Sequence, residues 1–167
     1  MNDAETTTTR TYRWSSPEQL AAIAPTGTVL EFLQKMIKGE LSQSALSSTL
    51  DFALVDVEEG RATIEARPAP YQCNAVGTIH GGAIASWLDT AMGYAIQSRL
   101  AAGVSLTTLD IQVRYLRAIK ADDPTLRVVG TAEHVGRTTA TARAEVFDDQ
   151  DRRLATASTS CLILHGR

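Results

Sequence analysis

The chain has 167 residues, of which 44% are hydrophobic and 21% charged, and its net charge is −3. This length suits one domain, and the composition is that of a folded globular protein. The acidic balance argues against a general nucleic-acid binder, whose phosphate contacts need a basic excess. The two cysteines, Cys73 and Cys161, lie far apart without a Cys-x-x-Cys pair, which argues against a disulfide scaffold or a zinc knuckle. We interpret each as a small buried hydrophobic residue.

The first residues of the chain do not resemble a targeting signal. Residues 1–13 are polar and rich in Thr, and no apolar signal core follows them. No stretch is apolar enough for a membrane span. We therefore expect a cytoplasmic protein without membrane or nucleic-acid partners, with a flexible N-terminal tail over 1–16 and a single domain over 17–167.

The first half of the chain predicts one helix and one hairpin. Residues 29–38 place apolar side chains on one helical face, and Gly39 ends the run. The Ser-rich segment 41–48 predicts a loop or a short turn. Strands are predicted over 51–57 and 61–67, with Glu58-Glu59-Gly60 as the turn between them.

The strongest helical signal covers about Gly82 to Leu100. Its apolar residues recur at helical spacing, although Trp87, Met92 and Tyr94 fit either a core or a pocket. The predicted amphipathic series comprises Ile84, Trp87, Leu88, Ala91, Met92 and Ala95.

Four strands are predicted after this helix, over 108–117, 125–135, 138–147 and 153–164. In the first of them, Leu109, Ile111, Val113 and Tyr115 alternate with polar residues. Strands joined by short links pair antiparallel. The order of elements therefore predicts an α+β fold, in which one long helix covers one face of an antiparallel sheet.

Asp89 is the only residue with a formal charge between Pro68 and Ser98. Charge-poor surroundings strengthen the electrostatic interactions of a carboxylate. Helical spacing places Asp89 with Gly82, Ser86 and Gly93, roughly 130° from the apolar stripe. This face of small residues can admit solvent, a ligand or a second chain. The alternative interpretation of Asp89 is a solvated helix carboxylate.

The segment Asn74-Ala-Val-Gly-Thr-Ile-His80-Gly81-Gly82 precedes this helix. Two glycines at a helix start let a ligand approach backbone N–H groups, and the helix N-terminus adds partial positive charge. These are the components of an oxyanion hole. Each also has a structural interpretation: Gly-Gly as a turn, His80 as a hydrogen-bonded structural histidine, and Asn74 as a turn residue.

The spacing of Gly81 and Asp89 constrains any shared chemistry. Eight residues on one helix span roughly 12 Å, whereas a base and an oxyanion donor must both lie about 3 Å from the reacting group. Two antiparallel copies of the helix could bring Gly81 of one chain to Asp89 of the other. The face of small residues would then be the dimer-facing side.

These residues resemble the hotdog-fold acyl-CoA thioesterases of the phenylacetate-degradation (PaaI) type. The resemblance rests on the Asn74–Gly82 string, on Leu-Asp89-Thr-Ala-Met-Gly, on Thr107–Arg117 and on His134–Thr138. It implies an antiparallel sheet wrapped around one long central helix. It also implies a homodimer or homotetramer with active sites at the subunit interface and acyl-CoA as the substrate.

The resemblance also assigns roles to particular residues. The Gly81 N–H, assisted by Asn74, would polarise the thioester carbonyl, and His80 would shape the site. Asp89 of the other subunit would act as general base or as nucleophile. Thr108 or Thr107 would position the water.

The remaining assignments concern substrate binding. Gly82 is placed with the substrate-binding residues, and Gly136 and Arg137 match a segment near the CoA nucleotide. A hairpin turn is the alternative for 135–138. Arg114 and Arg117 are interpreted as the polar face of a strand, and His134 and His165 as structural.

The chemistry implied needs no metal or cofactor. Thioester hydrolysis requires an activated water or a carboxylate nucleophile, together with charge stabilisation at the carbonyl oxygen. The sequence has no metal-ligand cluster and no Gly-x-Ser-x-Gly elbow, which argues against a serine hydrolase. Two alternatives remain: a hotdog hydratase or dehydratase that uses His80, and a non-catalytic module that binds acyl-CoA. The acyl group itself is not predicted by the sequence.

Overall fold

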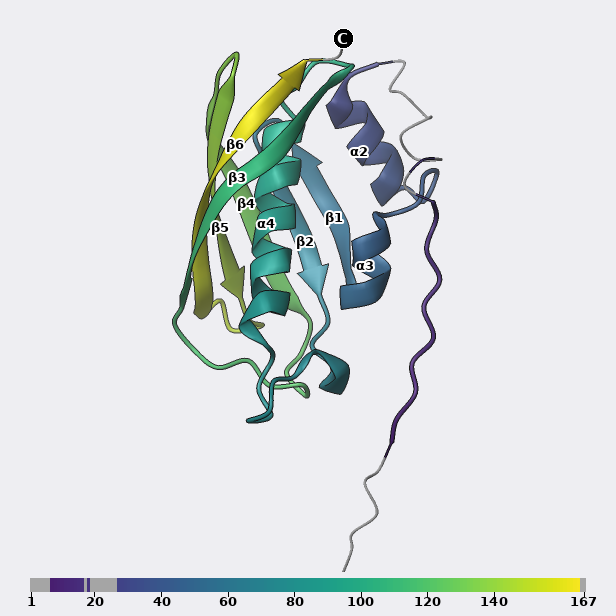
Figure 1. Cartoon of the computed structure of the whole chain (residues 1–167), viewed down its shortest axis with the longest axis vertical. Helices are drawn as coiled ribbons and strands as arrows, with labels where there is room; N and C mark the ends of the chain where they lie inside the picture. Colours follow the sequence, from purple (N-terminus) through teal and green to yellow (C-terminus); the bar gives the residue numbers. More distant parts are fainter. Residues whose placement is uncertain (1–6, 17, 19–26, 166–167) are drawn as a thin grey trace, which may run out of the picture.

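The computed structural model describes residues 7–16, 18 and 27–165 of the chain. Within them an antiparallel sheet wraps around the helix α4 (Gly81–Gln97), as Figure 1 shows. The predicted α+β hotdog architecture is confirmed. Of the predicted tail and domain, residues 1–6, 17, 19–26 and 166–167 lie outside the described residues.

The first described helix, α2 (Val29–Ile37), is one residue shorter than predicted. It begins with a capping box. The Thr28 hydroxyl accepts from the Glu31 N–H at 3.2 Å, and the Glu31 carboxylate accepts from the Thr28 N–H at 2.8 Å. Both interactions satisfy donors that the first helical turn leaves free.

A second helix, α3 (Ala45–Leu50), occupies part of the segment predicted as a loop or turn. The prediction over 41–48 was wrong at its C-terminal end. The Ser44 side chain accepts from the Ser47 N–H and caps the helix. Serine has only an intermediate helix propensity but is favoured at N-caps. A Ser-rich segment therefore looks like a loop even where a helix begins.

The predicted hairpin is confirmed as β1 (Phe52–Glu58) and β2 (Arg61–Ala66), which pair antiparallel. Gly60 in the turn has a φ of +80°, a conformation that glycine adopts readily. The four later strands are β3 (Val104–Tyr115), β4 (Leu126–Val135), β5 (Thr139–Phe147) and β6 (Arg153–His165).

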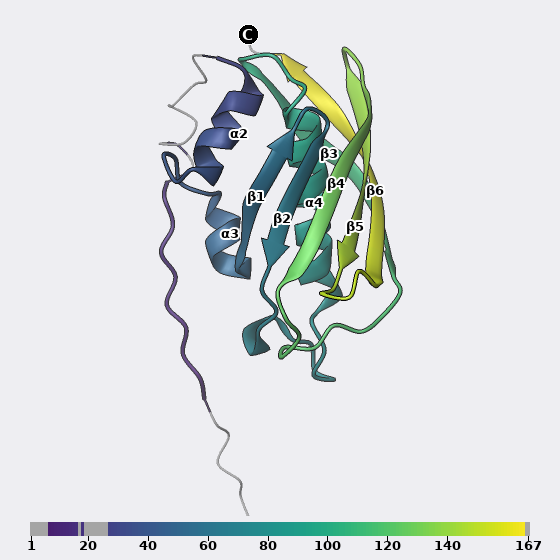
Figure 2. The same ribbon diagram turned by 180° about the vertical axis from the view of Figure 1, so that it is seen from behind.

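The six-stranded sheet formed by the described residues has the order β1-β2-β4-β5-β6-β3, which Figure 2 shows from its outer face. Every pair is antiparallel, as predicted, but consecutive strands are not always neighbours. β3 pairs with β6 at one edge, while β4 pairs with β2 and β5. The link between β3 and β4 crosses the N-terminal end of α4 and is held there by buried Ile119, whose carbonyl accepts from the Ile79 N–H at 2.8 Å.

A β-bulge interrupts β3 between Thr108 and Asp110. The extra residue reverses the alternation of side chains along the strand. Leu109, predicted as part of the inward apolar series, is therefore 57% exposed. Beyond the bulge, Ile111 and Val113 pack against the core as expected.

The core lies between α4 and the sheet. Trp87, Met92 and Tyr94 are all buried, which assigns them to the core. Gly130 in β4 lies directly under α4, and a Cβ there would overlap the Ala91 carbonyl. The helix thus rests on the sheet at a point where a side chain is absent. No helix in the described part of the chain is long and apolar enough to cross a membrane.

Candidate active site

The N-terminus of α4 presents one unused backbone donor. His80 is the N-cap, and its Nδ1 accepts from the Gly82 N–H at 2.9 Å. The N–H groups of Ala83 and Ile84 donate to the His80 carbonyl. Among the described residues, the Gly81 N–H has no hydrogen-bond partner. Of the two glycine N–H groups at this helix start, only that of Gly81 is therefore available to a ligand, because His80 accepts the hydrogen bond of Gly82.

His80 also ties the site to the preceding loop. Its backbone N–H donates to the Gln72 carbonyl at 2.8 Å. With Nδ1 accepting from Gly82, a neutral ring carries its proton on Nε2. The histidine thus has the structural role that the sequence allowed, and through that role it leaves Gly81 as the free donor.

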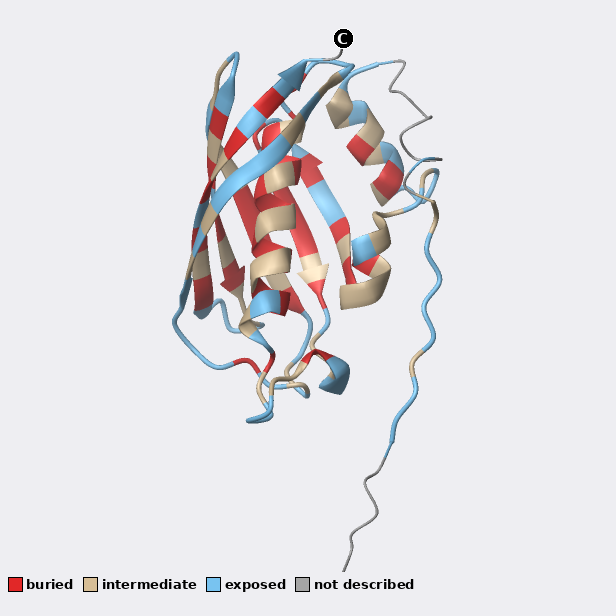
Figure 3. Cartoon of the chain, in the orientation of Figure 1, coloured by how far each residue is buried: buried red, intermediate tan, exposed pale blue. Residues whose placement is uncertain are grey.

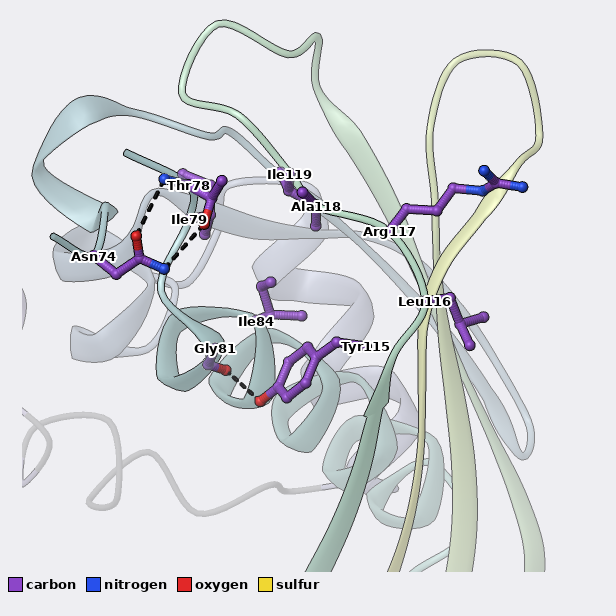
Figure 4. A pocket seen from close by; sticks show the side chains of 10 residues that line it. All are labelled: Asn74, Thr78, Ile79, Gly81, Ile84, Tyr115, Leu116, Arg117, Ala118 and Ile119. Atoms are coloured by element: carbon purple, nitrogen blue, oxygen red, sulfur yellow. Dashed lines mark hydrogen bonds between the residues drawn. The ribbon is translucent and has the colours of Figure 1, made fainter. Parts of the chain in front are cut away.

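Asn74 combines a turn with an available donor. Its Oδ1 accepts from the Val76 N–H at 3.0 Å and from the Thr78 N–H at 3.2 Å. Its Nδ2 donates to the Thr78 hydroxyl at 3.0 Å, as Figure 4 shows. An amide nitrogen carries two hydrogens, so one remains for a ligand. The turn interpretation and the site interpretation are compatible.

Asn74 and Gly81 line the same pocket, which we call the Gly81 pocket. It has a volume of about 320 Å³ and is formed where the loop before α4 meets the link after β3 (Figure 4). Arg117 belongs to this lining, although the sequence suggested only a polar strand face for it. The lining residues are Asn74, Thr78, Ile79, Gly81, Ile84, Tyr115, Leu116, Arg117, Ala118 and Ile119.

Tyr115 is a site residue that the sequence reasoning missed. Its hydroxyl donates to the Gly81 carbonyl at 2.8 Å. A Cβ on Gly81 would lie 3.0 Å from the tyrosine ring, so this position favours glycine. The available signal was the inward alternation of β3, which ends at Tyr115 and carries its side chain to the start of α4.

Asp89 lies two helical turns further along α4, is half-buried, and contacts the edge strand β3. The Thr108 hydroxyl donates to its Oδ1 at 3.0 Å. Neighbouring side chains of a strand point to opposite faces, so Thr107 is directed away from Asp89. The structure therefore brings Thr108, and not Thr107, to the carboxylate.

The face of α4 around Asp89 is open. Figure 3 shows the outward side of the helix as only partly buried. The Ser86 hydroxyl donates to the Gly82 carbonyl at 2.9 Å and the Thr90 hydroxyl to the Ser86 carbonyl at 2.8 Å. These bonds keep the polar groups against the helix. A Cβ on Gly93 would meet no atom within 4 Å.

Cys161 lies opposite Thr108 in the β3–β6 ladder and is fully buried. Burial raises the pKa of its thiol; hydrogen bonds with Thr159 and Thr108 lower the pKa, and the Asp89 and Asp110 carboxylates raise it. The thiol is therefore neutral near pH 7. This agrees with the interpretation of a small buried hydrophobic residue, while Cys73 is only half-buried.

A second pocket, the Tyr71 pocket, also adjoins the start of α4. Its volume is about 380 Å³. It includes His80, Gly82 and Ser86, so it lies on the small-residue side of the helix. The lining residues are Leu50, Tyr71, Gln72, Cys73, His80, Gly82, Ala83 and Ser86.

Gly136 and Arg137 form the turn between β4 and β5. The Gly136 N–H donates to the Thr139 carbonyl at 2.9 Å, which fits the hairpin interpretation. His165, interpreted as structural, makes a 2.7 Å hydrogen bond with the Arg137 carbonyl. Within one chain this turn lies at the opposite end of the molecule from the N-terminus of α4 (Figure 1). One chain alone does not bring it to Gly81.

No cluster of three or more His, Cys, Asp or Glu side chains that could hold a metal occurs within the described residues. The chemistry that a single chain offers is thus a polarising N–H at one point and a hydroxyl-bonded carboxylate at another. By helix geometry these points are roughly 12 Å apart.

Known proteins resemble this chain in sequence and in fold. The Thioesterase superfamily model matches residues 76–155. The acyl-coenzyme A thioesterase PaaI of Escherichia coli (strain K12) is 30% identical over 112 residues, which cover 66% of this chain and 76% of that protein.

Two solved structures extend the comparison. A putative thioesterase from Ralstonia eutropha JMP134, described as related to phenylacetic acid degradation, has a TM-score of 0.71 and 26% identity, covering 78% of this chain and 98% of that one. A Streptococcus mutans UA159 protein bound to acetyl-CoA has a TM-score of 0.63 and 28% identity, covering 70% of this chain and 90% of that one. This chain therefore belongs to the thioesterase superfamily, as a hotdog protein of the PaaI type.

Proposed function

We propose that this chain is an acyl-CoA thioesterase that hydrolyses an acyl- or aryl-CoA to the free acid and CoA. Each active site would combine Gly81 and Asn74 of one subunit with Asp89 and Thr108 of another. One observation carries the proposal: α4 starts with a free N–H and holds a hydroxyl-bonded carboxylate two turns later. The thioesterase activity of the E. coli relative supports it.

The steps follow from the groups present. The Gly81 N–H and the second Asn74 amide hydrogen bind the thioester oxygen, where negative charge develops. The partial positive charge of the helix N-terminus adds to this stabilisation. Asp89 removes a proton from water as the water attacks the carbonyl carbon; the C–S bond then breaks, and the CoA sulfur takes up a proton. Alternatively Asp89 attacks directly, and water hydrolyses the resulting anhydride.

Thr108 serves either route as an orienting group. Its hydroxyl already donates to Asp89 Oδ1, which fixes the carboxylate and leaves the other oxygen for water. A hydroxyl hydrogen-bonded on one side retains acceptor capacity for a water molecule. We assign it to positioning the water.

The edge of the sheet supports a homodimer, alone or within a tetramer. β3 is the last strand of the sheet, and no described strand pairs with its outer edge. Long exposed edges invite pairing with another chain. Two β3 strands pairing across a two-fold axis would set two α4 helices antiparallel, which matches the spacing argument for Gly81 and Asp89.

The dimer also gives Gly136 and Arg137 a role. They are remote from Gly81 in their own chain, and we place them near the CoA nucleotide of a site shared with the second subunit. The acetyl-CoA bound to the Streptococcus mutans relative supports a CoA ligand. Unpaired cysteines fit a reducing compartment, so we place the protein in the cytoplasm. We keep the division into an N-terminal tail over 1–16 and a single domain over 17–167 as part of this proposal.

The test is CoA release from a panel of acyl- and aryl-CoA substrates, followed as free thiol, beside hydration of crotonyl-CoA. We expect thiol release without hydration, because the proposed mechanism uses Asp89 as the base and gives His80 the role of capping Gly82. Hydration without thiol release would favour a hydratase. Binding of acyl-CoA without either reaction would favour a non-catalytic module.

A further inference from the structure

The segment 7–16 passes beside α3 and the short helix η1 (Pro70–Gln72), as Figure 1 shows, and Arg10 fastens it there. The Arg10 guanidinium donates to the Thr49 carbonyl at 3.1 Å and to the Ser48 carbonyl at 3.2 Å. It also lies 3.8 Å from the Asp51 carboxylate. These partners are the last turn of α3 and its C-cap, where a helix leaves carbonyls unpaired.

The same guanidinium stacks on an aromatic ring. Its central carbon lies 3.6 Å from the centroid of the Tyr71 ring and 4.7 Å from that of Tyr12. A planar guanidinium makes carbonyl hydrogen bonds at its edge and ring contacts at its face simultaneously. Arg10 thereby joins three segments that are distant in sequence: the N-terminal segment, α3 and η1.

Tyr71 is held from a second side by its neighbour. The Gln72 amide nitrogen donates to the Tyr71 hydroxyl at 3.1 Å and to the Leu50 carbonyl at 2.6 Å. The tyrosine is nevertheless 40% exposed, so packing alone does not fix its ring. The stacked guanidinium supplies the missing restraint.

Tyr71 forms part of the wall of the Tyr71 pocket, together with Leu50, Ala83 and His80. A pocket of about 380 Å³ has room for an acyl group larger than acetyl, since an apolar cavity of about 150 Å³ already binds benzene. Its apolar members suit a hydrocarbon chain, whereas the Gly81 pocket contains the cationic Arg117.

We propose that Arg10 is a positioning residue that fixes Tyr71 as a wall of the acyl-binding pocket and so limits the size of the acyl group. This inference rests on the proposed thioesterase function. Arg10 acts through Tyr71, which touches the acyl group. Loss of Arg10 frees the ring, widens the pocket and favours longer acyl chains.

The experiment compares kcat/KM for straight-chain acyl-CoAs from acetyl to decanoyl in wild type, Arg10→Ala and Arg13→Ala. Arg13 is a matched control because it lies in the same segment but lines a separate surface hollow with Trp14 and Ser42. We expect Arg10→Ala to raise the ratio of decanoyl to acetyl kcat/KM by about 10-fold, mainly through KM, within the range that pocket contacts discriminate chain length. Arg13→Ala should keep the wild-type ratio.

A double substitution shows whether the effect passes through Tyr71. We expect Tyr71→Ala to shift the ratio as Arg10→Ala does, and the double variant to equal Tyr71→Ala, because Arg10 then has no ring to restrain. Tyr71→Phe, which retains the ring, should stay close to wild type. An equal loss for all substrates in Arg10→Ala, or an additive double variant, would overturn the proposal.

The same ratio is also measured as dissociation constants of non-hydrolysable thioether analogues of acetyl- and decanoyl-CoA. This measurement separates the two hypotheses. If wild type hydrolyses no acyl-CoA while Arg10→Ala still shifts the binding ratio, the proposed function fails and the assignment of Arg10 stands. If the binding ratio does not move, the assignment of Arg10 fails, whatever the enzyme hydrolyses.

Discussion

Small residues on the two sides of α4 serve different purposes. On the inner face, Gly130 of the sheet lets the backbone of Ala91 come so close that no side chain would fit between them. On the outer face, Gly82 and Gly93 adjoin open space or the site itself, and Asp89 is the one carboxylate. On the inner face, the backbone of α4 occupies the space that a side chain at Gly130 would take. On the outer face, the missing side chains leave room for another molecule, and we assign that room to substrate and a second subunit.

The largest expected effect concerns the charged residue of the outer face. Asp89→Asn keeps the shape of the side chain and removes its basicity, so we expect kcat to fall by about 10²–10⁴-fold, the usual contribution of a general base. Steady-state assays measure it. The matched control is Asp110→Asn, because Asp110 lies just past the bulge on β3 and is hydrogen-bonded by Ser160 instead of Thr108.

Asp110→Asn should retain wild-type kcat within a few-fold, and both variants should unfold at the wild-type temperature. Equal losses in the two variants would show that Asp89 has no special role. Unchanged turnover in Asp89→Asn would remove the carboxylate from the mechanism.

The inner face predicts a loss of stability. Gly130→Ala places a methyl group against backbone atoms of α4, which cannot move as a flexible side chain would. Overpacking of this kind costs about 1–3 kcal/mol, and contact with backbone places it at the upper end. Urea unfolding measures the change. A free energy of unfolding equal to that of wild type would contradict the close approach of helix and sheet.

On the outer face, at Gly93, we expect a substitution by alanine to raise the stability instead of lowering it. Gly93→Ala adds a better helix former in open space, so the free energy of unfolding of the isolated chain should rise by up to about 1 kcal/mol. The bulkier Gly93→Leu should weaken the dimer, because it projects from the face assigned to the second subunit. Urea unfolding measures the first change, and sedimentation at several concentrations measures the second. A dimer as tight as that of wild type in Gly93→Leu would exclude this face from the interface.

The smallest expected effect is a difference in the reactivity of the two cysteine thiols. Cys161 is buried and burial raises its pKa, whereas Cys73 is half-buried beside the Tyr71 pocket. A thiol reagent at neutral pH should therefore modify Cys73 in the native protein and Cys161 only after unfolding. Counting modified thiols with and without denaturant checks this, and Cys73→Ser should leave no thiol that reacts in the native state.

The sequence predicted where the helices and strands lie better than it predicted which strands pair with one another. Periodicity located α4 and the strands within a few residues, because burial on one side imposes it. It did not predict the place of β3, since pairing with β6 depends on a link that crosses the end of α4. The helix α3 was missed because Ser44 acts as a cap, a role that composition does not distinguish from a loop.

For the candidate site, the sequence likewise identified residues but not the contacts between them. Gly81, Asn74, His80 and Asp89 were singled out by their combination and by the family resemblance, because each alone also has an ordinary structural interpretation. The capping of Gly82 by His80 and the contact of Tyr115 with Gly81 required coordinates, since both are side-chain interactions across a turn or between elements. The bulge at Leu109 decided between Thr107 and Thr108, and no alternation rule predicts where a bulge falls.

The central claim is that each active site is divided between two subunits, and mixing two inactive variants tests it most directly. Asn74→Asp keeps the oxygen that accepts from Val76 and Thr78 but removes the amide donor, while Asp89→Asn removes the base. A mixed dimer has one doubly damaged site and one intact site. Random mixing of equal amounts should thus restore about a quarter of wild-type activity, as two-fold symmetry requires. Activity no higher than the average of the two separate variants, with mixed dimers shown to have formed, would contradict the account.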